Sequence, residues 1–249
     1  MIPPHLLCNP DRVSPTVLLP GDPQRAQTIA EYFDTSEKVA QNREFHLFTG
    51  TYAGAPVSVC STGIGAPSAV IALEELIQCG AHTFIRVGSC GALQKDMDRG
   101  TLIIPTAACR GEGTSPRYAP LCYPAVAHGQ VVQALSDVLP QARKGIIWTD
   151  DSFYMSDHEY WSSLGILAVE MECSALFAVS SLKGVRTGAV LCVDGNLLRG
   201  TCKKMGKKTE KEGEFSQEAK NGIICEIKAA LEAVLLLSED EKRVSRGHE

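Results

Sequence analysis

The sequence predicts an α/β fold in which helices flank a mixed central sheet with largely parallel strands. Short apolar runs that suit buried strands alternate along the 249 residues with segments whose apolar side chains recur every three or four positions. Glycine and proline turns separate these segments, and no proline-rich or serine-rich linker divides the chain. We therefore expect one domain over residues 1–249, built from alternating strands and helices.

The predicted elements follow one another from the N-terminus. The apolar run 17–19 indicates a buried strand, and Asp22 is placed to cap a helix that begins at Pro23 and ends near residue 33. A long amphipathic helix is predicted over residues 215–237, and the charged dozen residues after it are expected to fray. The other predicted strands cover residues 56–61, 83–87, 102–104, 145–148 and 188–193, and the other predicted helices cover residues 66–79, 126–139 and 172–182.

The composition argues against several classes of protein. The formal net charge of −5 gives no electrostatic basis for binding nucleic acid or an anionic membrane surface. No apolar run approaches the roughly 20 residues of a membrane-spanning helix, and the N-terminal residues lack the pattern of a signal peptide. The ten cysteines show no Cys-x-x-Cys spacing, which argues against a zinc site or a disulfide framework. We expect a cytoplasmic protein with reduced thiols and no bound metal.

The first candidate site is the segment Arg86-Val87-Gly88-Ser89-Cys90-Gly91-Ala92, which follows a short apolar run. An arginine at the end of a strand, followed by a serine between two glycines, gathers a guanidinium, a hydroxyl and backbone N–H groups around one small volume. That volume suits an oxyanion, and phosphate best, because the planar guanidinium matches its oxygens. A purely structural glycine turn is the alternative.

A second glycine turn strengthens the anion-site interpretation. Gly21 follows the first predicted strand, and Arg25 lies in the opening turn of the helix after it. Ligands of parallel sheets bind at the carboxyl ends of strands, so Gly21, Arg25, Arg86 and Ser89 are expected to converge. The chain has neither a Walker A loop nor a dinucleotide fingerprint, which favours a small free phosphate over a bound nucleotide.

Acidic residues form the next candidates. Glu170 and Glu172 flank Met171 and could hold vicinal hydroxyls of a sugar, although an acidic helix N-terminus is the alternative. Asp194, at another strand end, could act as a general acid, with a plain Asp-Gly turn as the alternative. The polar segment 199–214 is rich in lysine and suits either a solvated loop or a mobile lid.

Taken together, these segments resemble the hexameric type of nucleoside phosphorylase, which includes bacterial purine nucleoside phosphorylase, uridine phosphorylase and methylthioadenosine phosphorylase. The pieces that carry the resemblance occur in the family's order and spacing between residue 4 and about residue 200. They are Pro4-His5, Gly21-Asp22-Pro23-x-Arg25, Asn42-Arg43-Glu44-Phe45, Gly63-Ile64-Gly65, Arg86 to Ala92, Phe153-Tyr154, Val169 to Glu172 and Val193-Asp194-Gly195.

The resemblance implies a role for each matching residue. Glu172 would hold the ribose 2′- and 3′-hydroxyls beside Met171 and Glu170, and Asp194 would protonate a leaving purine at N7. The implied phosphate cradle consists of Gly21, Arg25, Arg86 and Ser89, with Arg43 supplied by a neighbouring subunit. The other implied contacts are His5, also from the neighbour, on the ribose 5′-hydroxyl, and Phe153 with Tyr154 at the base. No cofactor is implied, since phosphate is a co-substrate.

The resemblance also implies an assembly in which neighbouring subunits share their active sites. Because His5 and Arg43 would act across an interface, we expect a homohexamer made of three dimers, with a nucleoside and phosphate as its ligands. A hydrolytic nucleosidase on the same fold is less favoured, because water needs no arginine cradle. A nucleoside-binding protein without turnover is the non-enzymatic alternative.

The identity of the base is less strongly indicated. Uridine phosphorylases resemble Phe-Tyr-Pro-Gly-Gln-x-Arg in the base segment, whereas this chain has Asp157 and Glu159 at the glutamine and arginine positions. That exchange of donors for acceptors favours purine nucleosides. The segment 110–126 looks more like uridine phosphorylase, and the segment 161–173 looks like archaeal methylthioadenosine phosphorylase, so both activities stay as alternatives. Arg199 is the nearby candidate for the arginine that follows the acid in bacterial enzymes.

Overall fold

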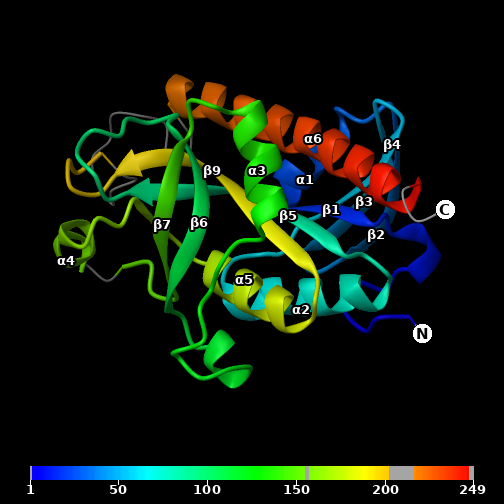
Figure 1. The fold of residues 1–249 in the computed structure, drawn as a ribbon, viewed down its shortest axis with the longest axis horizontal. Helices are drawn as coiled ribbons and strands as arrows, with labels where there is room; N and C mark the ends of the chain where they lie inside the picture. The colour runs from blue at the N-terminus through cyan, green and yellow to red at the C-terminus, as the bar shows by residue number, and fades with distance from the viewer. Residues whose placement is uncertain (1, 155–156, 202–215, 247–249) are drawn as a thin grey trace.

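In the part of the chain that the structure describes, nine strands form one mixed sheet with helices on both faces (Figure 1). The computed structural model describes residues 2–154, 157–201 and 216–246, and side chains up to residue 240. The strands are β1 Thr16–Pro20, β2 Thr35–Asn42, β3 Phe45–Tyr52, β4 Ala55–Cys60, β5 Thr83–Ala92, β6 Leu102–Gly111, β7 Arg143–Asp150, β8 Ala168–Glu170 and β9 Arg186–Asn196. The helices are α1 Pro23–Ala30, α2 Ala66–Gln78, α3 Gly129–Val138, α4 His158–Ser163, α5 Cys173–Leu182 and α6 Gln217–Arg246.

The strand order explains how one end of the sheet closes on itself. The order is β2-β3-β4-β1-β5-β8-β7-β6-β9, and β9 also pairs with β5 in parallel. Strands β5, β8, β7, β6 and β9 therefore form a closed circuit of pairings, while β2, β3, β4 and β1 extend from it as an open sheet. Strand β5 belongs to both parts, so the residues at its carboxyl end lie where they meet.

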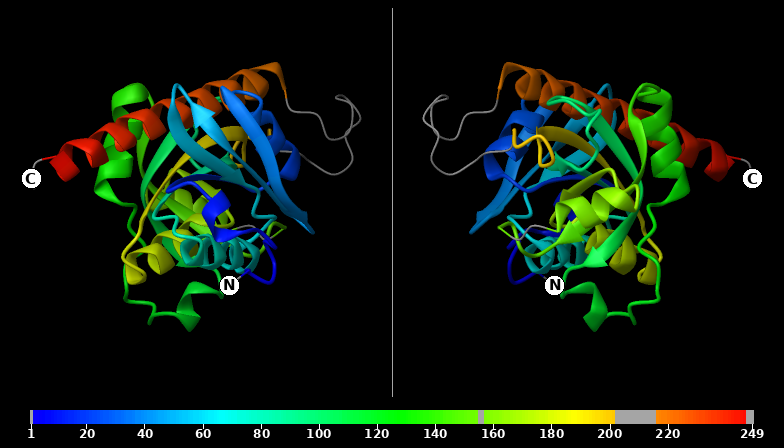
Figure 2. Two further views of the ribbon diagram at one scale, coloured as in Figure 1. Left: turned by 90° about the vertical axis from the view of Figure 1, so that its right-hand side faces the viewer. Right: turned by 90° about the vertical axis from the view of Figure 1, so that its left-hand side faces the viewer.

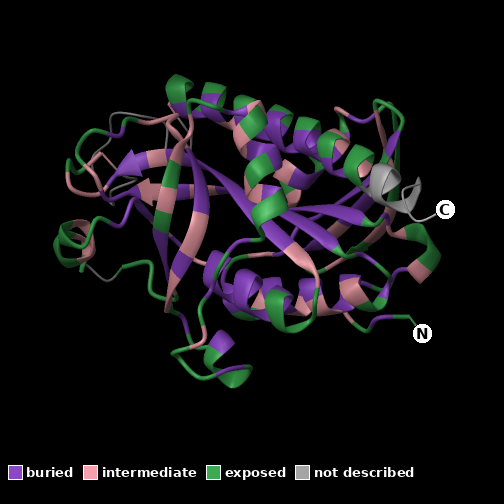
Figure 3. Ribbon diagram, viewed as in Figure 1, coloured by how far each residue is buried: buried purple, intermediate pink, exposed green. Residues whose placement is uncertain are grey.

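Side chains alternate between two core layers along the buried strands. In β1, Leu18 packs in the cluster that contains α1, α3 and α6, whereas Val17 and Leu19 pack in the cluster that contains α2 and α5. The period of two in a strand sends successive side chains to opposite faces. Two further views show α6 on the opposite side of the sheet from α2 (Figure 2), and the central strands are almost wholly buried between these layers (Figure 3).

The expected α/β fold is confirmed, and several element boundaries differ from those predicted; the strand predicted over residues 102–104, for example, continues to Gly111. The helix predicted from residue 126 begins at Gly129, because Val126 forms a β-bridge with Ala107 and the His128 amide donates to the Thr187 carbonyl. The charged residues after 237, which were expected to fray, continue α6 as far as Arg246. Most of the lysine-rich segment 199–214 lies outside the described residues.

Candidate active site

The glycine turn after β1 lies beside the middle of β5. The strands are parallel neighbours with Leu19 beside Arg86, and β5 continues to Ala92. The segment Arg86 to Ala92, predicted as a turn at a strand end, is therefore strand, because its residues pair with β9. Arg25, in the first turns of α1, donates from Nη2 to the Ser89 hydroxyl at 2.9 Å. Asp22 begins this helix as the sequence indicates, since its carboxylate accepts the Gln24 amide at 2.9 Å.

At two positions in this region, neighbouring atoms approach the backbone so closely that glycine is required. A Cβ at Gly21 would lie 3.1 Å from the Gly63 carbonyl oxygen, and the Gly63 amide donates to the Gly21 carbonyl at 2.9 Å. A Cβ at Gly88 would lie 2.8 Å from Cζ and Nη2 of Arg86. The glycine at 88 thus leaves room for the guanidinium to fold back against its own strand.

Arg86 is a buried cation held by two carboxylates. Its Nε donates to Glu170 at 2.9 Å, and its Nη2 forms an ion pair with Glu172. Burial lowers the pKa of the Arg86 guanidinium, but Glu172 and Glu170 raise it more, so the pKa lies above its ordinary value and the charge is permanent. The two carboxylates fix the orientation of the arginine as well as its charge.

The two glutamates have different surroundings. Besides Arg86, Glu170 accepts the Thr149 hydroxyl at 2.6 Å and the backbone amides of Glu172 at 2.9 Å and Cys173 at 3.0 Å. Both of its oxygens therefore accept hydrogen bonds from this chain, and Glu170 links Arg86 to the start of α5. Glu172 accepts the Gly65 amide at 2.6 Å, and burial raises the pKa of its carboxyl despite Arg86, which lowers it. The side chain of Met171, between them, is half-buried.

Asp194 occupies a β-bulge. Along the β5–β9 pair, Cys90 lies opposite Val193 and Gly91 lies opposite Gly195, so Asp194 is the extra residue. A bulge redirects its side chain out of the regular alternation. The Asp194 carboxylate raises the pKa of the Cys90 thiol, although burial contributes more. The acid therefore lies beside the segment that carries Ser89.

The base-segment aromatics lie in the loop after β7. Phe153 is 67% exposed and Tyr154 is 80% exposed, and their rings meet edge to face with centroids 5.2 Å apart. Asp157 and Glu159, the two acceptors predicted in this segment, are exposed at the start of α4. Arg199 is positioned on another loop, because it pairs with Asp98 and donates to the Lys95 carbonyl at 3.1 Å.

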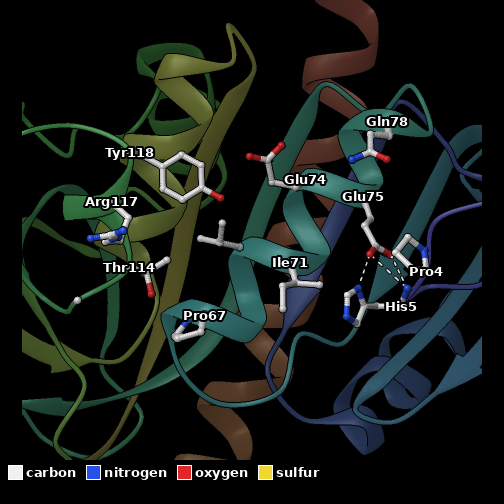
Figure 4. A pocket seen from close by; sticks show the side chains of 12 residues that line it. Pro4, His5, Pro67, Ile71, Glu74, Glu75, Gln78, Thr114, Arg117 and Tyr118 are labelled. Carbon is white, nitrogen blue, oxygen red and sulfur yellow. Dashed lines mark hydrogen bonds and ion pairs between the residues drawn. The ribbon is translucent and has the colours of Figure 1, made fainter.

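His5 and Arg43 lie together in a second group of predicted site residues. Nδ1 of His5 is 2.6 Å from Glu75 on α2, and the amides of His5 and Leu6 donate to the same carboxylate (Figure 4). Arg43 is exposed in the turn between β2 and β3 with a φ of 51°. The side-chain NH₂ group of the neighbouring Asn42 donates to the His5 carbonyl at 2.7 Å.

A cavity of about 560 Å³ opens beside His5, between α2 and the loop that contains Tyr118. Its lining includes Glu74 and Glu75 but not Arg25, Arg86 or Ser89. The structure thus separates the predicted residues into two groups. One group surrounds Arg86, and the other surrounds His5.

Sequence reasoning did not single out several residues of these networks. Glu75 and Glu226 are acidic residues within otherwise apolar helix faces, which is the signal that could have identified them. Thr149 and Gly65 carried no such signal, because their roles depend on contacts between distant segments. In the described part of the chain, no three His, Cys, Asp or Glu side chains cluster as metal ligands, and no helix is long and apolar enough to cross a membrane.

Known proteins share this fold and sequence. Residues 15–232 match the family model described as the phosphorylase superfamily. Guanosine phosphorylase of Halorubrum lacusprofundi is 42% identical over 241 residues, covering 94% of this chain and 98% of that protein. Uridine phosphorylase of Treponema pallidum is 47% identical over 201 residues, covering 74% and 78%. The crystal structure of purine nucleoside phosphorylase from Toxoplasma gondii in complex with immucillin-H has a TM-score of 0.87 and 31% identity, covering 96% and 97%.

The chain therefore belongs to the phosphorylase superfamily. Within it, the chain is a nucleoside phosphorylase, an enzyme of the glycosyltransferase type. The predicted family and fold are both confirmed.

Proposed function

We propose that the enzyme cleaves purine ribonucleosides and 2′-deoxyribonucleosides with phosphate, giving the free purine and the sugar 1-phosphate. The observation that carries this proposal is the arrangement around Arg86. A permanent buried cation packs against Gly88 of β5, the Arg25–Ser89 hydrogen bond lies at the next residue of the strand, and Glu172 pairs with the cation. An anion and a neutral sugar can therefore occupy adjacent positions.

The proposed mechanism follows from the charges. Arg25, Arg86 and the Ser89 hydroxyl hold phosphate, whose oxygen attacks C1′ of the ribose as the glycosidic bond breaks. The sugar gains positive charge in this transition state, and the bound phosphate stabilises that charge. Glu172 and Met171 hold the ribose, and Glu170 fixes Arg86 from below. Holding both reactants in line removes a large part of the entropic barrier.

Asp194 is the proposed general acid. A purine is a poor leaving group as an anion, so a proton delivered to N7 as the bond breaks lowers the barrier. The bulge at Asp194 supports this role, because it turns one carboxylate away from the sheet at the strand end beside the cradle. Phe153 and Tyr154 would contact the base from their exposed loop. No cofactor enters this mechanism.

Purines are favoured over uracil by the base segment and by one relative. Asp157 and Glu159 are exposed acceptors where glutamine and arginine would read a pyrimidine, and the relative from Halorubrum is a guanosine phosphorylase over nearly its full length. Uridine is the second candidate, because the relative from Treponema is a uridine phosphorylase at 47% identity. Methylthioadenosine is a further alternative.

We also propose that the active site is completed by a neighbouring subunit in a homohexamer of three dimers. His5 lines a cavity that contains none of the Arg86 group, and Arg43 lies in the turn next to Asn42, whose side chain contacts His5. Such a pair can serve the ribose and phosphate of the next subunit. Light scattering with an activity assay tests this, since an active monomer would refute the shared site.

A substrate panel tests the purine assignment. Initial rates of base release from inosine, guanosine, adenosine, methylthioadenosine and uridine are compared at saturating phosphate. The proposal expects the highest kcat/KM for inosine or guanosine. A higher kcat/KM for uridine would replace the purine assignment with the uridine alternative, while the phosphate site would be unaffected.

A further inference from the structure

A buried glutamate on α6 contacts the proposed phosphate cradle. The side chain of Glu226 is fully buried, and its Oε2 lies 3.6 Å from Nη1 of Arg25. The other terminal nitrogen of the same guanidinium donates to Ser89. Arg25 is therefore held between a residue of the cradle and an acid that none of the assigned roles uses.

The surroundings of Glu226 are unfavourable for a negative charge. Among the described residues, no donor makes a hydrogen bond of normal geometry to either carboxylate oxygen. Burial raises the pKa of the Glu226 carboxyl to about 8, although Arg25, Arg86 and the backbone amide of Gly88 lower it. An ionised carboxylate without good hydrogen bonds is costly in a protein interior.

We propose that Glu226 is a positioning residue of the phosphate site that is neutral when the phosphate dianion is bound, and that takes up a proton from solvent when the dianion binds at alkaline pH. This inference rests on the cradle assigned under the proposed function. One guanidinium would otherwise face two anions, and the second negative charge disfavours the ionised form of the first. The carboxylate of Glu226 gains one proton and becomes a neutral acid, which leaves Arg25 to the phosphate.

Other titratable groups surround Glu226. Arg25 of α1 and Arg86 of β5 face it as permanent cations. The thiols of Cys90 on β5 and Cys192 on β9 also face it, and burial raises both thiol pKa values well above the ordinary value, so they remain neutral. Asp194 lies near these thiols. It is the other carboxylate that could take up a proton when an anion binds, so the experiment must distinguish it from Glu226.

Sulfate binding to the full-length enzyme measures this proton without catalysis. Sulfate is a dianion at every pH between 6 and 10, so any pH dependence belongs to the protein. Isothermal titration calorimetry in buffers of different ionisation enthalpy gives the number of protons taken up. The wild type should take up most of one proton at pH 8.5, and its sulfate affinity should fall by up to ~10-fold per pH unit above 8.

Three variants assign the proton. Glu226→Gln should remove the proton uptake and flatten the pH profile. Glu239→Gln, an exposed residue of the same helix, and Asp194→Asn should both keep the wild-type uptake. If the glutamine variant does not fold, Glu226→Met replaces it as an uncharged side chain of similar length.

The failure of this inference is distinguishable from failure of the proposed function. Phosphate-dependent base release together with no proton uptake in the wild type would overturn the role of Glu226 alone. Uptake that persists in Glu226→Gln, or that disappears in Asp194→Asn, would overturn it as well. No sulfate binding together with no phosphate-dependent base release would overturn the cradle, and the inference would fall with it.

Discussion

Replacing Glu170 by glutamine removes the charge that holds Arg86 while keeping the shape of the side chain. Both carboxylate oxygens accept hydrogen bonds: one accepts the Thr149 hydroxyl and the Cys173 amide, and the other accepts Arg86 Nε and the Glu172 amide. A glutamine offers one oxygen and one NH₂ group, so a donor must face a donor at one of these positions. The substitution also leaves the buried guanidinium with Glu172 as its remaining carboxylate partner.

The size of the effect follows from these contacts. Breaking one partner of a buried ion pair costs about 3–5 kcal/mol. In a chain of this length, each kcal/mol lowers Tm by about 2–4 °C. Glu170→Gln should therefore lower Tm by roughly 6–20 °C and should also raise the KM for phosphate, because Arg86 is no longer fixed in the cradle.

Differential scanning fluorimetry at a fixed protein concentration measures the change in Tm, and initial rates at varied phosphate measure KM. Glu159→Gln is the matched control, because Glu159 is exposed at the start of α4 and should leave Tm unchanged. A Glu170→Gln protein with wild-type Tm and wild-type phosphate KM would show that Glu170 does not support Arg86.

Three further predictions follow from the same site. Gly88→Ala places a methyl group 2.8 Å from the Arg86 guanidinium, which Glu170 and Glu172 hold in place. The phosphate KM should therefore rise about tenfold or more, with little change in the nucleoside KM. Equal changes in the two KM values would contradict this. Asp194→Asn should lower kcat for inosine by ~10²–10⁴ while sulfate binds as in the wild type, and an unchanged kcat would remove Asp194 from the acid role. Burial raises the folded-state pKa of Glu226 to about 8, so its contribution to stability is present below the unfolded value near 4.5 and is lost as pH rises towards 8. The Tm of the wild type relative to Glu226→Gln should therefore fall over this pH window and then level off. A constant difference in Tm would refute the shift.

The sequence predicted the buried elements well, because burial imposes strong periodic patterns. Strand β1 is a continuous apolar run and was identified, whereas β2 and β3 were both missed; the residues of β2 are mostly exposed and polar. Strand β2 forms because its backbone pairs with β3, and its composition alone does not favour a strand. The extension of α6 was missed for a related reason: charged residues look like a frayed end, but glutamate, lysine and arginine are good helix formers.

Part of the convergence of the candidate site residues could be predicted from the sequence, and the detailed geometry could not. Arg25 and Ser89 were expected to converge from the rule that parallel strands present their carboxyl ends together, and they are hydrogen-bonded in the structure. The bulge at Asp194 depends on the register between β5 and β9, which no local pattern encodes. The contact of Glu226 with Arg25 joins α6 to α1 across 201 positions of sequence, so only the folded chain reveals it.

In the proposed mechanism, Arg25, Arg86 and Ser89 hold the phosphate that attacks the nucleoside. The most direct measurement is the phosphate KM of Arg25→Ala against wild type, with sugar 1-phosphate followed by phosphorus NMR during inosine cleavage. Losing hydrogen bonds from a charged donor costs about 1.5–3 kcal/mol each, so phosphate KM should rise by ~10- to 150-fold while sugar 1-phosphate remains the product. An unchanged phosphate KM in Arg25→Ala would place the phosphate elsewhere and contradict the account.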